Sequence, residues 1–330
     1  MKILVTGGAG FIGSCFIRHM LNKYKDYKII NLDALTYAGN IANLNDVKDN
    51  QNYTFIEGNI CDKNLVPQLV EQVDAIVNFA AESHVDRSIS GPEIFVETNV
   101  KGTLNLLQSA KEFGVSRYLQ VSTDEVYGSL GKDGYFYETT PLAPNSPYSA
   151  SKASADMLVR AYYETYKLPV LTTRCSNNYG PYQYPEKLIP LFISLLQNNE
   201  KVPVYGDGLN VRDWLYVYDH CAAIDTVLHR GRTGEVYNIG GHNEKTNLEI
   251  TKIILDAMGK DESYIKYVDD RLGHDRRYAI SNDKITSELG WAPSVTFEEG
   301  IVMTIDWYMN NQEWIENIKN RLEFKKAGIH

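Results

Sequence analysis

Apolar and polar positions alternate along the first half of the chain in a regular order of short strands and helices. Residues 2–6 form an apolar run, glycines crowd positions 7–13, and apolar side chains recur at helical spacing over 11–21. This order predicts a strand, a tight turn and a helix. Further strands are predicted at 28–32, 53–57, 75–79, 118–122 and 170–174. Strands that alternate with helices indicate a doubly wound parallel α/β sheet.

Two of the intervening helices carry signals of their own. Ser146 and Pro147 suit the N-cap and first position of the helix that precedes the strand at 170–174. Another helix, over 96–111, has four apolar side chains on one face: Val96, Val100, Leu104 and Leu107. Core packing and contact with a second copy of the chain explain such a face equally well.

The pattern changes after about residue 175, where turn-rich segments at 177–181 and 205–208 interrupt shorter periodic runs. The chain has 330 residues, more than a single domain usually contains. We expect the main sheet domain over 1–175 and a smaller α/β substrate lobe mainly over 176–330. Residues 236–239 read as a strand that can return to the main sheet. The second lobe is therefore expected to be partly discontinuous, with a returning segment near 212–240.

Composition and charge argue against several classes of protein. The net charge of −9 disfavours a nucleic-acid-binding surface, which requires basic patches. No apolar run approaches the roughly 18 residues of a membrane span. Residues 1–6 lead into the glycine cluster before a signal-peptide core forms, so cytoplasmic residence is expected. The four cysteines lack metal-ligand spacing and are expected to be reduced, and no metal site is predicted.

The glycine cluster is a candidate dinucleotide-binding loop of the Rossmann type. Gly8, Gly10 and Gly13 fit a Gly-x-Gly-x-x-Gly pattern, whereas Gly7 with the last two fits Gly-x-x-Gly-x-x-Gly, so the register stays open. In either register, glycines allow a tight turn and close approach of the backbone to a pyrophosphate at a helix N-terminus.

Asp33 ends the next predicted strand, twenty residues after Gly13. A carboxylate at that place accepts hydrogen bonds from ribose hydroxyls and repels a 2′-phosphate. NAD is therefore favoured over NADP, and a solvated turn carboxylate is the alternative.

Tyr148 and Lys152 stand four residues apart and therefore share a helix face. A phenol that acts as a base needs a cation beside it, because a positive charge about 4 Å away favours the phenolate by roughly 4 kcal/mol. We therefore expect Lys152 to bring the phenol pKa from its ordinary value toward neutrality. The spacing also arises by chance on surface helices.

Thr123, Asp124 and Glu125 directly follow the predicted strand at 118–122. Ligands of open α/β sheets bind at the carboxyl ends of the strands. Two adjacent carboxylates there are candidate acid–base groups, and a solvated acidic turn is the alternative.

With these motifs the chain resembles the extended short-chain dehydrogenase/reductase family, in particular its nucleotide-sugar 4,6-dehydratases. The resemblance covers nearly the whole chain. Besides the glycine loop, Tyr148 and Lys152, it rests on four segments: 80–88 (AAESHVDRS), 122–128 (STDEVYG), 177–181 (NNYGP) and 185–190 (PEKLIP).

The resemblance implies a hydro-lyase of deoxysugar biosynthesis that forms a 4-keto-6-deoxy sugar from a nucleoside-diphosphate glucose. Tyr148 would take the O4 proton while the C4 hydride passes to NAD, and the hydride would later return to C6. Glu125 would remove the C5 proton, and Asp124, protonated when it acts, would protonate the departing 6-hydroxyl. Thr123 would hydrogen-bond O4, and Lys152 would also hold the nicotinamide ribose. Thymidine is the favoured base, with cytidine or uridine as alternatives.

The same resemblance implies two sets of binding residues and a homodimer formed by the helices near 96–111 and 148–166. NAD would contact Gly7, Gly10, Phe11, Ile12, Gly13, Asp33, Asn59, Ile60, Ala80, Ala81, Tyr148 and Lys152. The nucleotide sugar would contact His84, Ser88, Thr123, Asn177, Lys187, Leu188, Pro203, Tyr205, Arg212, Asn247, Arg271 and His274. The two arginines supply planar donors for a diphosphate in an otherwise acidic protein.

Two positions depart from the family's pattern. Asn59 stands where the family usually has Asp to meet the adenine amino group, and its side-chain oxygen can still accept a hydrogen bond. Ser281 also replaces an expected Asp, and the sequence suggests no mechanistic interpretation of that change.

Two other functions compete with the dehydratase. A nucleotide-sugar 4-epimerase or decarboxylase would share the glycine loop and the Tyr–Lys pair. An epimerase has no water to expel, however, so Asp124 beside Glu125 would lack a task. A cofactor-sensing protein that has lost catalysis would keep the fold. The intact set of candidate catalytic residues argues against that reading.

Overall fold

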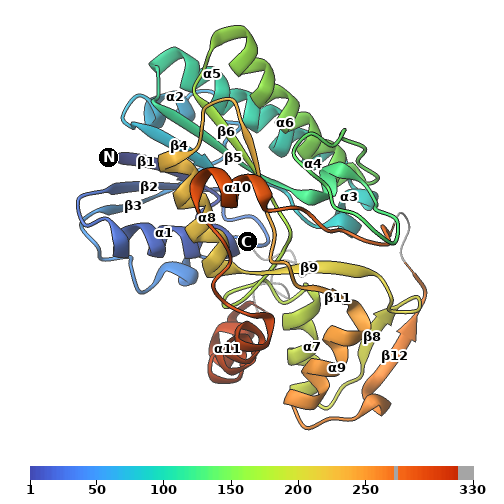
Figure 1. Cartoon of the computed structure of the whole chain (residues 1–330). Helices are drawn as coiled ribbons and strands as arrows, with labels where there is room; N and C mark the ends of the chain where they lie inside the picture. The colour runs from blue at the N-terminus through green and yellow to red at the C-terminus, as the bar shows by residue number, and fades with distance from the viewer. Residues whose placement is uncertain (271–273, 319–330) are drawn as a thin grey trace.

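The computed structural model of the chain describes residues 1–270 and 274–318 (Figure 1). Its centre is a seven-stranded parallel sheet in the order β10-β6-β5-β4-β1-β2-β3. The strands are β1 (Lys2–Thr6), β2 (Lys28–Asp33), β3 (Tyr53–Glu57), β4 (Ala75–Asn78), β5 (Arg117–Thr123), β6 (Val170–Cys175) and β10 (Val236–Ile239). The strands predicted for the first domain are all present, with ends within one residue of the prediction.

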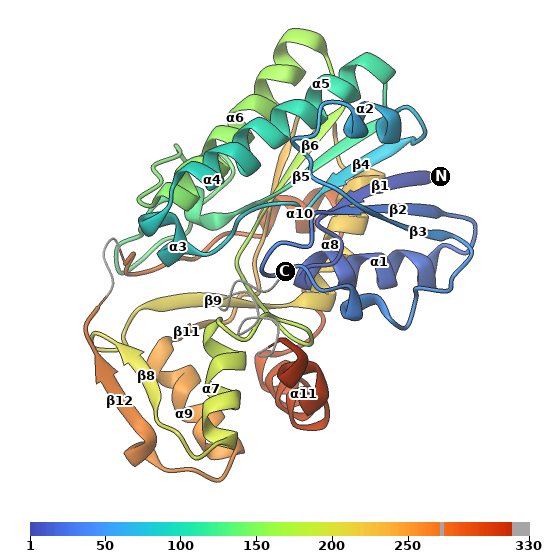
Figure 2. The same cartoon turned by 180° about the vertical axis from the view of Figure 1, so that it is seen from behind.

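Helices cover both faces of this sheet (Figures 1 and 2). Side chains alternate along β1, so that Ile3 and Val5 enter one core and Leu4 enters the other. The first core packs against α1 (Phe11–Lys23), α8 (Val217–Arg230) and α10 (Asp283–Leu289), and the second against α2 (Leu65–Val70), α5 (Thr103–Phe113) and α6 (Pro147–Tyr166). The predicted doubly wound fold is confirmed.

The strand order places a ligand-binding edge beside the glycine loop. β1 lies between β2 and β4. From β1 the chain adds β2 and β3 on one side, and it then returns to the other side of β1 to add β4, β5 and β6. The carboxyl ends of β1 and β4 therefore form the switch point of the sheet, where ligands of such folds bind. Short helices follow several strands: η1 (Ile41–Leu44), α3 (Val85–Ser90) and η3 (Asp124–Tyr127).

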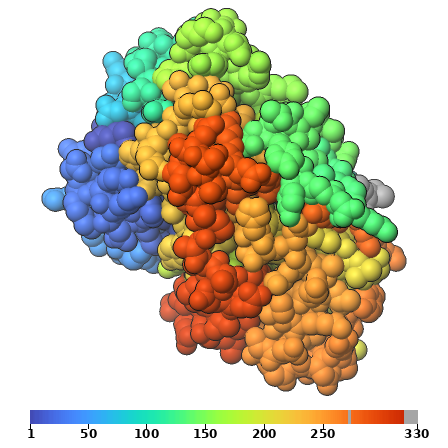
Figure 3. Space-filling view, viewed as in Figure 1, coloured from blue at the N-terminus to red at the C-terminus, as the bar shows by residue number. Residues whose placement is uncertain are grey.

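The strand predicted to return to the main sheet is confirmed, because β10 pairs in parallel with β6. A second lobe surrounds this return. It contains β7 (Asn177–Tyr179), β8 (Val202–Tyr205), β9 (Val211–Tyr216), β11 (Glu244–Thr246), β12 (Ile265–Val268), α7 (Leu188–Gln197), α9 (Asn247–Ala257), η4 (Glu262–Tyr264) and α11 (Phe297–Asn310). Figure 3 shows the orange-to-red segment that carries α10 and α11 running along one face from the sheet layer to this lobe.

The segment predicted as one helix over 96–111 has a more complex course. α4 (Glu93–Phe95) continues into a π-helical stretch, Val96–Gly102, and then into α5. Val96 and Leu104 are 50% and 36% exposed, whereas Leu107 is buried. The prediction of one uniform face was wrong here, because the wider π turn rotates the following residues relative to an α-helical period.

Candidate active site

A cavity of about 320 Å³ lies at the carboxyl edge of the main sheet. Loops that follow β1, β2, β3, β4, β5 and β6 contribute to its wall, together with the start of α6. The wall brings together every residue predicted to contact NAD and every predicted catalytic residue. These are Gly7, Gly10, Phe11, Ile12, Gly13, Asp33, Asn59, Ile60, Ala80, Ala81, Thr123, Asp124, Glu125, Tyr148 and Lys152.

The loop between β1 and α1 has two positions that exclude any side chain. Gly7 has φ +69°, and a Cβ on it would lie 2.6 Å from the Ala80 nitrogen. A Cβ on Gly13 would lie 2.4 Å from the Gly7 carbonyl oxygen. Gly10 is the N-cap of α1 and offers no side-chain cap. The helix N-terminus thus faces the cavity, as an anion-binding loop requires.

Asp33 ends β2 and points back toward this loop. Its Oδ2 accepts a hydrogen bond from the Ala9 nitrogen at 2.8 Å, and its Oδ1 accepts one from the Leu35 nitrogen at 2.9 Å. Burial raises the pKa of this carboxyl, and the two backbone donors oppose that rise. The carboxylate is therefore fixed in place beside the glycine loop, where the hydroxyls of a ribose fit.

Asn59 lines the same cavity, and its side-chain oxygen has one partner already. Asn59 Oδ1 accepts a hydrogen bond from the Cys61 nitrogen at 2.8 Å. An amide oxygen has two lone pairs, so one stays available to an amino group in the cavity. This local turn gives a structural reason why Asn serves at a position where the family usually has Asp.

The acid pair lies where β5 gives way to η3. The Thr123 hydroxyl accepts a hydrogen bond from the Glu125 nitrogen at 3.3 Å and donates one to Asp124 Oδ1 at 3.3 Å. Thr123 therefore caps the short helix and fixes the two carboxylates after it. Asp124 is 2% exposed, whereas Glu125 is less buried. The two neighbouring acids thus have different environments.

Tyr148 and Lys152 lie one turn apart near the start of α6, and both side chains are buried. Ser146 and Ser149 form a capping box there, and Pro147 occupies the first helical position, as the sequence predicts. The Lys152 ammonium donates to the Val121 carbonyl oxygen at 2.7 Å. Helix α6 thus presents both groups to the end of β5.

The electrostatics of Tyr148 differ from the sequence-based prediction. Burial and the nearby Glu125 carboxylate raise the pKa of this phenol well above its ordinary value, and a hydrogen bond with Thr123 opposes the rise only in part. Burial also lowers the pKa of Lys152. The prediction that Lys152 brings the phenol near neutrality is therefore wrong, because burial and the nearby carboxylate raise the phenol pKa instead.

Asp124 has the properties of a carboxylic acid that keeps its proton. Burial raises its pKa well above the ordinary value, and the carboxylates of Glu125 and Asp213 add to the rise. Its Oδ2 is buried, and no group in the described part of the chain hydrogen-bonds to that oxygen. A protonated Asp124 can therefore donate to a group in the cavity.

Some of the predicted sugar-nucleotide contacts lie at this cavity and others lie farther out. Asn177 and Lys187 line it, and the Lys187 ammonium donates to the Ser83 carbonyl oxygen at 3.3 Å. His84 lies nearby, with its Nε2 3.8 Å from Glu186 Oε2. Ser88 is fully buried, and its hydroxyl donates to the Val85 carbonyl oxygen at 2.6 Å. Leu188 begins α7 directly after Lys187.

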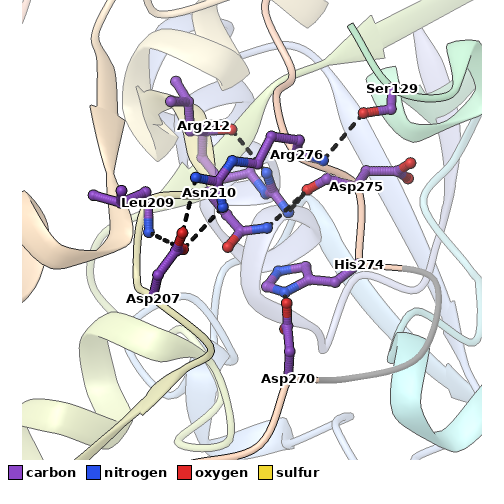
Figure 4. A network of polar contacts seen from close by, with 10 residues as sticks. Ser129, Asp207, Leu209, Asn210, Arg212, Asp270, His274, Asp275 and Arg276 are labelled. Atoms are coloured by element: carbon purple, nitrogen blue, oxygen red, sulfur yellow. Dashed lines mark hydrogen bonds and ion pairs between the residues drawn. The ribbon is translucent and has the colours of Figure 1, made fainter. Parts of the chain in front are cut away.

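The remaining predicted contacts belong to the second lobe and do not line the cavity: Pro203, Tyr205, Arg212, Asn247 and His274. Figure 4 shows Arg212 and His274 within one polar network there. The buried Arg212 guanidinium donates to the Asp275 carbonyl oxygen at 2.9 Å, and His274 Nδ1 lies 2.6 Å from Asp270 Oδ1. Arg271 lies outside the described residues.

Sequence reasoning missed a large share of the cavity wall. Ser122 lies next to the end of β5, and Cys175 ends β6. Their positions at the carboxyl edge of the sheet could have identified them from the sequence. Tyr37 and Tyr182 come from loops with no periodic pattern, so nothing local marks them. Within residues 1–270 and 274–318, no group of three or more His, Cys, Asp or Glu side chains could hold a metal ion.

Ser281, the second departure from the family's pattern, has a structural role. Its hydroxyl accepts a hydrogen bond from the Asp283 nitrogen at 3.0 Å, at the start of α10. An Asp carboxylate would accept the same bond, so the serine preserves this contact to the first residue of α10, whose N-cap residue, Asn282, makes no side-chain cap hydrogen bond.

A parallel nucleotide-binding sheet with a Tyr–Lys helix and a Thr-Asp-Glu turn at its carboxyl edge defines the class of extended short-chain dehydrogenases/reductases. Comparison with known proteins gives a narrower result. The protein-family model described as GDP-mannose 4,6 dehydratase matches residues 4–304. A relative described as dTDP-glucose 4,6-dehydratase, from Xanthomonas campestris pv. campestris (strain B100), is 54% identical over 335 residues, which cover 96% of this chain and 95% of the relative.

Solved structures agree with this result. DesIV, a dTDP-glucose 4,6-dehydratase from Streptomyces venezuelae with NAD and TYD bound, is 53% identical with a TM-score of 0.94, covering 96% of this chain and all of that one (100%). UDP-glucose 4-epimerase from Thermotoga maritima, with UDP-glucose, has a TM-score of 0.88 but only 31% identity, covering 94% of this chain and 100% of that one. The chain belongs to the nucleotide-sugar 4,6-dehydratases of the extended short-chain dehydrogenase/reductase family, as the sequence predicted.

Proposed function

We propose that the protein is an NAD-dependent hydro-lyase that converts dTDP-glucose to dTDP-4-keto-6-deoxyglucose and water. The observation that carries this function is the pairing of a buried Asp124, whose pKa burial raises well above its ordinary value, with Glu125 in the cavity that also holds Tyr148 and Lys152. Elimination of water requires a base at C5 and an acid at the 6-hydroxyl. Asp124 is the more buried of the two groups and therefore favours the protonated form of an acid, whereas the less buried Glu125 suits the base.

NAD is the cofactor, and the residues of the cavity suit it. A glycine loop at a helix N-terminus fits the pyrophosphate, and Asp33 fits the adenosine ribose. Asn59 and Ile60 line the wall next to them, where the adenine ring would lie. When bound, NAD supplies a place for the C4 hydride until the hydride returns to C6.

The chain's own residues move the protons. Tyr148 takes the proton from the sugar O4, and Thr123 hydrogen-bonds that oxygen. Glu125 removes the C5 proton, which the 4-ketone makes acidic, and Asp124 protonates the departing 6-hydroxyl. C5 then regains a proton. The phenol pKa must fall from its raised value before Tyr148 acts, and bound NAD in its oxidised form would supply a positive charge that favours that change.

The second lobe binds the nucleotide half of the substrate in this proposal. Arg212 lies on β9 and is buried at 5% exposure, and its guanidinium stacks over the Tyr278 ring at 4.4 Å from the centroid. A guanidinium held in this way is a suitable donor for a diphosphate. The remaining contacts, from His84 to His274 and including Arg271, stay predictions. The lobe boundaries at 1–175 and 176–330, with a returning segment near 212–240, are part of the same proposal.

A homodimer is supported by apolar side chains that the helices leave exposed. Ile94 and Val96 are each 50% exposed, and Met157 on the adjacent α6 is 59% exposed. Figures 1 and 2 show α4 and α6 side by side on the edge of the molecule. Large apolar groups gathered on neighbouring elements mark interaction surfaces, and most soluble oligomers are symmetric homo-oligomers.

We further propose cytoplasmic residence. The four cysteines are free thiols, the state expected in a reducing compartment. Among the described residues, no helix is long and apolar enough to cross a membrane.

Isotope tracing tests the proposed reaction. The purified protein is incubated, without added NAD, with dTDP-glucose deuterated at C4 and, separately, with the CDP and UDP analogues. Loss of one water with deuterium retained in the product at C6 is the expected result, fastest with the thymidine nucleotide. A product that retains all its water after NAD is supplied would contradict the dehydratase, and inversion at C4 would indicate an epimerase.

A further inference from the structure

Trp314 ties the last described helix to the back of the glycine loop. Residues 312–318 are helical, and Ile315 and Ile318 bury their side chains against the molecule. On this helix the Trp314 indole nitrogen donates a hydrogen bond to Asn43 Oδ1 at 2.8 Å. The two residues are 271 positions apart in the sequence, so only tertiary folding brings them together.

Asn43 in turn hydrogen-bonds to the glycine loop. It lies in η1, is 2% exposed, and its Nδ2 donates to the Ala9 carbonyl oxygen at 2.9 Å. The Asn40 nitrogen donates to the same oxygen at 3.0 Å. The Ala9 nitrogen in turn donates to Asp33 Oδ2 at 2.8 Å. The peptide groups on both sides of Ala9, in the middle of the loop, are therefore oriented from behind by η1 and Asp33.

Trp314 also supports a second wall of the cavity. Its ring meets the Tyr182 ring edge-on at 5.8 Å, and the Trp307 ring lies 4.5 Å from Tyr182. Tyr182 lines the cavity, and the guanidinium of Arg18 on α1 stacks over the Tyr182 ring, 4.3 Å from its centroid. The Trp314 indole thus contacts both Asn43, which hydrogen-bonds to the glycine loop, and Tyr182, which lines the cavity.

We propose that Trp314 is a positioning residue that keeps NAD in its cavity between turnovers by holding Asn43 against the glycine loop. This role rests on the proposed use of NAD. A dehydratase that regenerates oxidised NAD in each cycle gains nothing from releasing it, so slow release suits the reaction. Removal of the indole N–H strands a buried amide oxygen, and the loop then loosens.

The test compares two tryptophans of the same cluster. Trp314→Phe keeps an aromatic ring against Tyr182 and removes only the donor. Trp307→Phe is the matched control, because its indole N–H donates to no group in the described part of the chain. Each full-length protein is loaded with radiolabelled NAD, and release of the label into excess unlabelled NAD is timed. Turnover at saturating NAD and the thermal midpoint are measured alongside.

For Trp314→Phe we expect release to accelerate about tenfold, which corresponds to about 1.4 kcal/mol, with turnover at saturating NAD within twofold of the wild type. Trp307→Phe is expected to release NAD at nearly the wild-type rate. Asn43→Asp gives a second check, since it keeps the acceptor for Trp314 and loses the donor to Ala9. It should also release NAD faster, and combining it with Trp314→Phe should add little.

Three results would overturn the proposal: wild-type release from Trp314→Phe, equal acceleration in both tryptophan variants, or fully additive effects of Asn43→Asp and Trp314→Phe. A wild-type protein that takes up no NAD would instead overturn the proposed function on which the role rests. The two failures are distinguishable because the wild type is measured first.

Discussion

At the scale of single residues, Asp124 shows how burial prepares a carboxyl group for acid catalysis. Asp124 directly follows the buried strand β5, and the carboxylates of Glu125 and Asp213 act on its pKa. Asp213 is itself 1% exposed and accepts hydrogen bonds from the Gly241 and Asn243 nitrogens at 2.8 and 2.7 Å. Burial raises the pKa of Asp213, and those two bonds oppose the rise by stabilising its negative charge. A charge on Asp213 in turn makes a second charge on Asp124 more costly, which adds to the rise of the Asp124 pKa.

This arrangement predicts a stability cost that rises with pH. The folded chain keeps a proton on Asp124 that the unfolded chain loses above its ordinary pKa of 3.8. The folded state then binds more protons, so stability falls as the pH rises from that value toward the raised folded pKa. Asp124→Asn cannot titrate, so we expect it to be more stable than the wild type at about pH 7 and to lose this advantage at about pH 4.

Urea unfolding at the two pH values measures the difference, with Asp133→Asn in an exposed loop as the control. A stability gain of Asp124→Asn that did not depend on pH would contradict the assignment of a retained proton. The same variant should lose dehydration by roughly 10²- to 10⁴-fold, because the leaving hydroxyl has no acid.

Replacing Glu125 should separate the oxidation of the sugar at C4 from the elimination of water. In Glu125→Gln the Thr123 cap and the cofactor cradle stay intact, but the base for the C5 proton is lost. We expect NAD binding to survive and water loss to fall by roughly 10²- to 10⁴-fold. Single-turnover mixing should then show NADH absorbance that rises and persists, because the 4-ketone forms and does not react further.

Glu138→Gln provides the comparison, since Glu138 lies outside the cavity wall and accepts a hydrogen bond from the Asn238 nitrogen through an oxygen that Gln retains. Unchanged water loss in Glu125→Gln would remove this residue from the mechanism and leave the elimination without its assigned base.

At the scale of elements, the start of α6 matters because Tyr148 is its second residue. The Ser146 hydroxyl accepts a hydrogen bond from the Ser149 nitrogen at 3.0 Å, which fixes the first turn. We predict that Ser146→Ala lowers the free energy of unfolding by about 1 kcal/mol and reduces turnover several-fold, since a frayed first turn displaces the phenol.

Thr296→Ala is the matched control, because Thr296 caps α11 through the same type of capping box, away from the cavity. It should lower stability to a similar extent and leave turnover nearly unchanged. Chemical unfolding measures the stability of both variants, and steady-state kinetics measures their turnover. An equal loss of turnover in both variants would indicate general destabilisation in place of a displaced Tyr148.

At the scale of the whole molecule, the exposed apolar groups near the π-helical stretch predict how two copies associate. Val96→Arg places a charge in the middle of the proposed contact, and a buried unpaired charge costs several kcal/mol. We expect a monomer in analytical ultracentrifugation at concentrations where the wild type is a dimer. Val302→Arg, on the 53% exposed position of α11, is expected to leave the dimer intact. A wild-type monomer would rule out the dimer itself.

Much of the fold was accessible from local patterns. The strands ending at Thr6, Asp33 and Thr123 were predicted because apolar runs and their flanking turns involve residues adjacent in the chain. The helix over 96–111 was predicted less well, since the π-helical insertion at Val96–Gly102 leaves no signature in an apolar period.

The sequence alone determined the succession of strands and helices along the first domain, the glycine loop, Asp33 and the Thr-Asp-Glu and Tyr–Lys groups, because each is a short-range pattern of residue types. Tertiary structure decided what depends on burial and on distant contacts. Burial in the folded protein raised the pKa of Tyr148, contrary to the expectation from its spacing to Lys152, and folding joined Trp314 to Asn43 across most of the chain. Desolvation and long-range packing are set by the surroundings of a residue in space, which its neighbours in sequence do not encode.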